Sequence, residues 1–75
     1  MNASNEPYFQ AAVNAAKTRT YRAAVSAGLR HADRDDLYQE IILDLLQRAP
    51  QFDPAKGSEG TFTGMVSQNR TADFL

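Results

Sequence analysis

The sequence predicts an all-α fold, a compact bundle of three to four helices. An alanine-rich stretch over residues 8–29 has high helix propensity. Further along the chain, Leu37, Ile41 and Leu45 recur at the spacing of one helical face. Gly28 and Pro50 stand where these two stretches end, as residues that terminate helices do. The 75 residues make one domain, near the size at which a single hydrophobic core becomes marginal.

The composition argues against several classes of protein. Without cysteine, neither a disulfide framework nor a thiolate metal site is available. There is no apolar run of membrane-spanning length and no signal-peptide pattern, so we expect a soluble, cytoplasmic protein with no membrane partner. The net charge of −1 is low for a protein that binds duplex DNA by itself. We therefore expect weak DNA binding by the isolated chain.

The first helical region is predicted over residues 7–30, as one helix or as a pair of helices with a break near Lys17–Thr20. Residues 1–6 form a polar lead that is expected to fray, with Ser4 or Asn5 as the helix cap. Arg19, Arg22 and Arg30 share one side, which is either a solvated face or a contact to nucleic acid phosphate or an acidic protein surface. The expected apolar stripe consists of Phe9, Val13, Ala16, Thr20 and Ala24.

The second helix is predicted over residues 33–49, with Asp33 as its N-cap and Pro50 beyond its end. Its buried face is expected to hold Leu37, Tyr38, Ile41, Ile42, Leu45 and Leu46. A second stripe runs along the opposite side and combines carboxylates, amides and one leucine. That leucine is either a lone exposed apolar residue or the anchor of a partner surface with a polar rim. The stripe consists of Asp36, Gln39, Glu40, Leu43 and Gln47.

Residues 50–58 are predicted to form a loop, and residues 58–75 the last helix. Phe52 is expected to pack back into the core, and Ser58 to cap the helix. Gly60 and Gly64 weaken this helix by on the order of 1 kcal/mol each relative to alanine. Phe62, Met65, Val66 and Asn69 are predicted to share one side of it.

Nothing in the sequence predicts an enzyme, a metal site or a cofactor. The common nucleophile, zinc-protease and phosphate-loop motifs are missing. His31 is the only histidine, so it has no partner of its own kind for a metal. Asp33, Asp35 and Asp36 lack the spacing of a calcium loop and are better explained as the start of a helix.

Two motifs, joined by a helix of suitable length, carry a family resemblance. The first is D-L-x-Q-E over Asp36–Glu40, and the second is F-D-P-x-K-G over Phe52–Gly57. With the leucine-rich helix between them, they resemble region two of bacterial RNA polymerase sigma factors, in particular the extracytoplasmic-function type. The resemblance covers Asp33–Leu75 and is incomplete at its C-terminal end, where the family's strongly basic segment would follow. Glu59, Gly60 and Gly64 stand where the family often has aromatic or bulky residues.

The resemblance implies two functional surfaces. The stripe of Asp36, Gln39, Glu40, Leu43 and Gln47 would dock on the clamp helices of the polymerase beta-prime subunit. The turn and the last helix would help to recognise and melt the promoter −10 element and hold bases flipped from the non-template strand. Phe62 is either a stacking platform for such a base or a core residue. The implied DNA-binding residues are Lys56, Ser58, Thr61, Phe62, Asn69 and Arg70.

Two functions from different classes remain open at the level of sequence. One is a transcription initiation factor module that docks on the polymerase and contacts promoter DNA. The alternative is a sigma-mimicking protein-interaction module that binds an anti-sigma factor or the polymerase without touching DNA. A chance match by an ordinary helical bundle is the third possibility. A basic helix and a further DNA-binding domain after Leu75 would favour the initiation factor.

Overall fold

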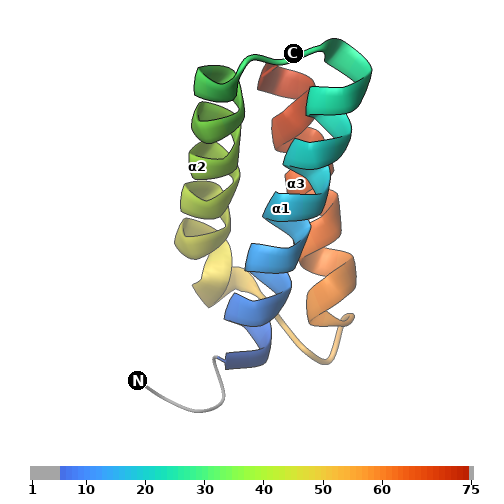
Figure 1. Cartoon of the computed structure of the whole chain (residues 1–75). Coiled ribbons are helices and arrows are strands. Elements are labelled where there is room, and N and C mark those ends of the chain that lie inside the picture. The colour runs from blue at the N-terminus through green and yellow to red at the C-terminus, as the bar shows by residue number, and fades with distance from the viewer. Residues whose placement is uncertain (1–5, 75) are drawn as a thin grey trace.

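The computed structural model describes residues 6–74, which form three α-helices and one short 3-10 helix. The elements are α1 (Glu6–Ala27), α2 (His31–Arg48), η2 (Ala49–Gln51) and α3 (Glu59–Phe74). Helix α1 runs up the bundle, α2 returns beside it, and α3 runs up again, so that all three helices contact one another (Figure 1). The predicted all-α bundle is confirmed. No helix in this part of the chain is long and apolar enough to cross a membrane.

The turn between α1 and α2 is tight because a glycine ends the first helix. Gly28 has a φ of +66°, the left-handed conformation that terminates many helices. The Leu29 amide donates a hydrogen bond of 3.3 Å to the Ala24 carbonyl, which satisfies one of the last carbonyls of α1. Gly28 is thus a helix terminator, as predicted. Helix α1 passes through Lys17–Thr20 as one continuous helix.

The predicted N-cap of α2 was wrong. The helix begins at His31, and its N-cap is Arg30, whose side chain makes no capping hydrogen bond. Asp33 lies inside the first turn, where its carboxylate suits the positive end of the helix dipole. The tight glycine turn explains why the helix begins earlier than predicted. Arg30 follows the turn with extended backbone, and its carbonyl accepts a hydrogen bond of 2.9 Å from the Arg34 amide, which starts the helix at His31. The Ser4 or Asn5 cap predicted for α1 lies outside the described residues.

Among the described residues, α2 supplies all the large aliphatic side chains that are fully buried in the core. Leu37, Ile41 and Leu45 of α2 are fully buried, whereas Leu46, predicted on the same face, is 45% exposed. On α1 the predicted stripe is only partly right. Ala16, Thr20 and Ala24 are buried, but Phe9 and Val13 are only half-buried. The buried positions toward the start of α1 are Tyr8 and Ala12.

Helix α3 buries a polar face, and the residues predicted to share another side of it are half-buried (Phe62, Val66) or exposed (Met65, Asn69). Thr63, Ser67 and Thr71 are buried, and each hydroxyl donates to a carbonyl four residues earlier, at 2.8, 2.7 and 2.7 Å. Because these hydroxyls are satisfied within the helix, small polar side chains can be buried at low cost. They also allow α3 to lie close to the alanines of α1, and the Thr63 hydroxyl reaches the Ala11 carbonyl at 3.5 Å. Met65 is 60% exposed as a result.

Two glycine substitutions should shift stability in opposite directions. A Cβ atom at Gly64 would meet nothing within 4 Å, so Gly64→Ala should stabilise the fold by about 1 kcal/mol through helix propensity. That corresponds to a rise in Tm of roughly 4–8 °C in a domain of this size. Gly28→Ala should instead destabilise by about 1–2 kcal/mol, because alanine is strained at positive φ. Thermal unfolding followed by circular dichroism measures both, and a lower Tm for Gly64→Ala would contradict this packing.

Candidate functional site

The stripe predicted on α2 lies on the surface. Asp36, Gln39, Glu40, Leu43 and Gln47 are all exposed, and the Leu43 side chain is 57% exposed. Leu46 lies three residues further along the helix and adds a second exposed apolar side chain. An apolar anchor therefore stands among carboxylates and amides, which is the composition of a protein-binding surface with a polar rim.

The inner side of α2 holds a buried carboxylate that the sequence analysis missed. Asp44 is only 8% exposed and accepts a hydrogen bond of 2.7 Å from Nε of Arg48. Its other oxygen is 3.2 Å from a terminal guanidinium nitrogen of Arg70, which joins α2 to α3. The signals for this site were the four-residue spacing of Asp44 and Arg48 and the position of Asp44 beside the buried leucine. Arg70, which was expected to reach phosphate, is an ion-pair partner here.

Tyr8 extends this polar connection to α1. Its hydroxyl donates a hydrogen bond to the Leu45 carbonyl near the end of α2. Burial raises the pKa of the Tyr8 hydroxyl, and the negative charge of Asp44 raises it further, while Arg48 opposes the shift. The hydroxyl therefore stays protonated and keeps donating throughout the neutral pH range.

Four of the six predicted DNA-binding residues line one hollow of about 250 Å³ between the loop and α3. Ser58 caps the helix as predicted, since its hydroxyl oxygen accepts the Thr61 amide at 3.1 Å. The same hydroxyl donates to the Thr61 hydroxyl at 3.0 Å. The lining residues are Gln51, Phe52, Asp53, Lys56, Gly57, Ser58, Thr61, Phe62 and Met65.

Phe62 belongs to both the core and this hollow. Its ring lies 5.4 Å from that of Phe52 and 6.1 Å from that of Tyr8, measured between centroids. The predicted packing of Phe52 into the core is thus correct, and both rings are half-buried. Asn69 is exposed and lies apart from this hollow, beside a smaller one of about 80 Å³ that Arg70 also lines.

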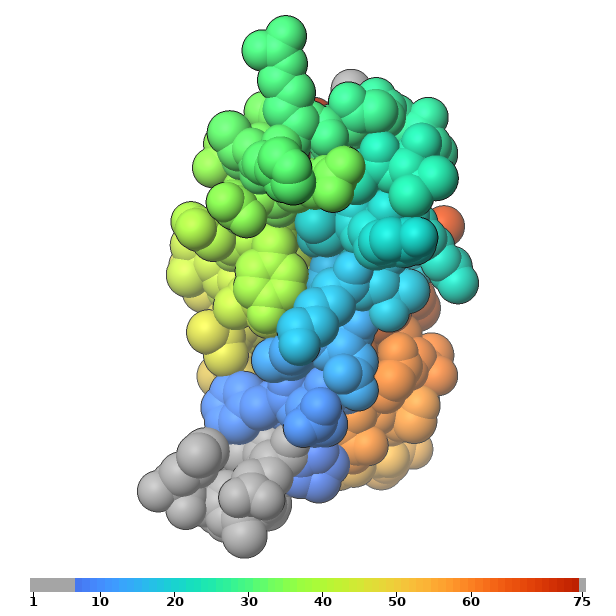
Figure 2. Space-filling view, viewed as in Figure 1, coloured from blue at the N-terminus to red at the C-terminus, as the bar shows by residue number. Residues whose placement is uncertain are grey.

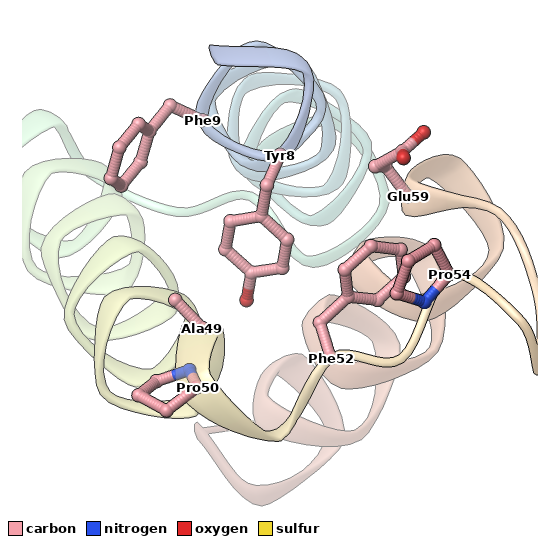
Figure 3. Close-up of a pocket in the computed structure, with 7 residues that line it drawn as sticks. All are labelled: Tyr8, Phe9, Ala49, Pro50, Phe52, Pro54 and Glu59. Carbon is pink, nitrogen blue, oxygen red and sulfur yellow. The ribbon is translucent and has the colours of Figure 1, made fainter. Parts of the chain in front are cut away.

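A larger hollow of about 390 Å³ lies at the end of the bundle where α1 and α3 begin and α2 ends. The Tyr8 ring points into it, toward the end of α2, and Phe52 lies beside Pro54, with its ring centroid 5.5 Å from that of Tyr8 (Figure 3). Glu59 stands at the rim with its carboxylate turned away from the Tyr8 ring (Figure 3). Phe52 lines both this hollow and the smaller loop hollow.

The fold and these surfaces define a small helical module with a polar-rimmed apolar patch on one helix and a partly aromatic hollow beside another. The family model for Sigma-70 region 2 matches residues 12–75, and the chain belongs to this family. No curated protein and no solved structure was found to match. Family membership gives the chain a sigma-factor-like role in transcription initiation and in interaction with core RNA polymerase. The family is one of non-enzymatic transcription factor domains.

The ion pairs of Asp44 with Arg48 and Arg70 should contribute to the stability of the fold. Asp44→Ala should lower the free energy of unfolding by about 1–3 kcal/mol, because it leaves two guanidinium groups without their shared partner. Arg70→Gln should cost less, since the Arg70 side chain is itself 37% exposed and Arg48 remains paired. Asp35→Asn, which removes an exposed charge from the helix that carries Asp44, is the matched control. Urea unfolding of the variants measures these differences, and wild-type stability for Asp44→Ala would show that the ion pairs contribute nothing.

Proposed function

We propose that this domain docks on core RNA polymerase through the α2 stripe, with the clamp helices of the beta-prime subunit as the partner, and contributes to recognition and melting of the promoter −10 element. The observation that carries the proposal is the exposure of Leu43 inside a polar stripe on the helix that bears the D-L-x-Q-E motif. Membership of the Sigma-70 region 2 family supports the assignment of the polymerase as the partner.

The docking step is favourable mainly through apolar burial. Covering a leucine side chain contributes about 1.5–3 kcal/mol, and Leu46 extends the area beside Leu43. Asp36 and Glu40 contribute differently, because exposed carboxylates act on steering and register more than on affinity. A basic partner surface would fit this rim. Gln39 and Gln47 supply amide hydrogen-bonding groups on the same stripe.

The DNA-facing step depends on the hollow between the loop and α3. Unstacking a base costs a few kcal/mol, which contacts in a pocket must offset. The ring of Phe62 and the thioether of Met65 offer apolar surface for a flipped base, and the linked hydroxyls of Ser58 and Thr61 offer hydrogen bonds to its edge. Lys56 lies at the same hollow and can meet a phosphate. Because the chain carries a net charge of −1, we expect this step only once the polymerase has positioned the DNA.

Binding to the isolated clamp helices tests the docking step. Leu43→Ala should weaken the affinity about tenfold or more, and Glu40→Arg should slow association and change its salt dependence. Val25→Ala removes a similarly exposed apolar side chain on α1 and is the control expected to bind normally. Titration calorimetry with the folded variants gives the affinities. Equal loss in the Leu43 and Val25 variants, or no binding by the wild-type domain, would remove this docking surface.

Promoter opening by the assembled complex tests the DNA-facing step. A fluorescent base analogue in the non-template strand reports unstacking when the domain is added with core polymerase. Thr61→Val and Lys56→Gln should reduce the opened fraction several-fold without affecting polymerase binding, because they alter only the hollow. Gln68→Ala, exposed on α3 outside the hollow, should behave as the wild type. A wild-type complex that forms but never opens DNA would instead support the sigma-mimicking function.

A further inference from the structure

The hollow of about 390 Å³ at the end of the bundle takes no part in either step of the proposed function. The beginning of α1 (blue), the end of α2 (yellow) and the beginning of α3 (orange) meet at this end of the molecule (Figure 2). Only Phe52 is shared with the lining of the loop hollow, and no residue of the α2 stripe lines it. Its volume is in the range of small-ligand sites. It is therefore a separate candidate site.

Three aromatic rings form much of the wall of this hollow. The ring centroid of Tyr8 lies 6.2 Å from that of Phe9, with the two rings nearly perpendicular, and 5.5 Å from that of Phe52. Tyr8 is the most deeply buried of the three, whereas Phe9 and Phe52 are half-buried. The face of an aromatic ring carries negative potential, so rings gathered around a hollow attract a cation.

The wall that α2 contributes is the negative end of a helix. Ala49 and Pro50 follow the last residue of α2 and line the hollow, and the helix dipole is negative at this end. The basic residue of the last turn is Arg48, whose side chain is held by Asp44 at 2.7 Å and does not line the hollow. The electrostatics of this wall therefore also favour a cation.

Glu59 supplies the one carboxylate of the lining, and none of the basic residues that the structure describes lines the hollow. The Glu59 side chain is half-buried and forms no ion pair within residues 6–74. Its carboxylate stands at the rim, turned away from the Tyr8 ring (Figure 3). Its place in the first turn of α3 suits the helix dipole, so it also stabilises the helix. A carboxylate at the mouth adds to the preference of the hollow for positive charge.

We propose that this hollow binds an arginine side chain of a protein partner, with the guanidinium group against the aromatic rings and its outer N–H groups directed to the Glu59 carboxylate. Arginine suits each part of the lining. Its planar, weakly hydrated guanidinium stacks on aromatic faces, and its fork of donors matches a carboxylate. Its apolar stem would cover Pro50 and Pro54, which lie in the same lining.

Other ligands fit this lining less well. An anion would meet the Glu59 carboxylate, the negative ring faces and the negative end of α2 together. A lysine ammonium is a compact and strongly hydrated charge, which loses more hydration than a guanidinium on entering an aromatic hollow. A quaternary ammonium suits the rings but has no N–H to donate to the carboxylate.

Titration of the full chain with N-acetyl-arginine amide, followed by ¹H–¹⁵N chemical shifts at constant ionic strength, tests the proposal. Saturable shifts should appear at the amides of Ala49, Phe52 and Glu59, with a Kd in the millimolar range or tighter. N-acetyl-citrulline amide is the matched control, because a neutral urea of the same shape replaces the guanidinium. It should bind about tenfold more weakly. Equal binding of the two compounds, or no saturable shift with the arginine compound, would overturn the proposal.

Three further compounds distinguish the source of the cation. N-acetyl-lysine amide and tetramethylammonium chloride should each bind several-fold more weakly than N-acetyl-arginine amide. Free arginine should also bind more weakly, because its own carboxylate would approach Glu59. If any of the three binds as tightly as the arginine amide, the hollow is not a site for an arginine side chain of a protein, and the assignment is wrong.

Variants of the hollow test the roles of its charge and its rings. Glu59→Gln keeps the shape of the rim side chain and should weaken binding of the arginine amide several-fold, whereas Asp73→Asn, on the same helix outside the lining, should not. Phe9→Leu keeps an apolar side chain without the ring and should also weaken binding, whereas Tyr21→Leu, at a ring 71% exposed elsewhere on α1, should not. Thermal unfolding confirms that each variant is folded. Wild-type affinity in folded Glu59→Gln and Phe9→Leu variants would contradict the site.

This site and the proposed function can fail separately. Leu43→Ala and Lys56→Gln should bind the arginine amide as the wild type does, because neither residue lines this hollow. Glu59→Gln should in turn bind the clamp helices normally, since Glu59 lies outside the α2 stripe. Loss of arginine-amide binding in the Leu43→Ala or Lys56→Gln variant would contradict a separate site at the end of the bundle.

Discussion

The contact between α3 and α1 determines where every other feature of this domain lies. Thr63, Ser67 and Thr71 form the buried side of α3, and each hydroxyl bonds back to its own helix. Because these side chains are small, α3 lies close to the alanines of α1. The same orientation places Phe62 and Met65 along the loop hollow, with Phe62 also packed against the core and Met65 60% exposed. The hollow that we propose for a flipped base therefore lies where α3 turns these two side chains toward the loop.

Two further interactions hold the loop and the third helix in place. Asp44 joins α2 to α3 through Arg70, and the Tyr8 hydroxyl joins the beginning of α1 to the end of α2. The rings of Tyr8, Phe52 and Phe62 then pack together at the end of the bundle where the loop returns. A core with few large aliphatic residues is thus supplemented by polar and aromatic contacts. The loop hollow shares its walls with this cluster, so its shape depends on the packing of the whole domain.

Local patterns predicted some parts of this structure well. The spacing of Leu37, Ile41 and Leu45 fits only one face of a helix. Gly28 as a helix terminator and Ser58 as an N-cap could also be predicted, because each acts on backbone groups within one helical turn. The predicted Asp33 cap was wrong because the tight turn at Gly28 lets α2 begin at His31, two residues before Asp33. The other failures depend on contacts between distant residues.

The polar face of α3 illustrates the same limit. A search for an apolar helix face does not find buried threonine and serine. It groups Phe62 and Met65 on one side of the helix instead. Arg70 could not be assigned from sequence, because its partner Asp44 lies 26 residues away on another helix. For the candidate site, helical spacing located the exposed stripe of α2, and the family resemblance implied four residues that line one hollow. Neither indicated that Arg70 would form an ion pair within the fold.

The proposed functions divide the domain between two surfaces. The stripe of α2 would face protein, while the loop hollow would face nucleic acid. The proposed docking requires Leu43 to contact the polymerase clamp helices, and site-specific crosslinking tests this contact most directly. With a photoreactive amino acid at position 43, irradiation in the presence of core polymerase should produce a crosslink within the beta-prime clamp helices, and the same group at position 25 should not. A crosslink from position 25 to the clamp, with none from position 43, would contradict the account.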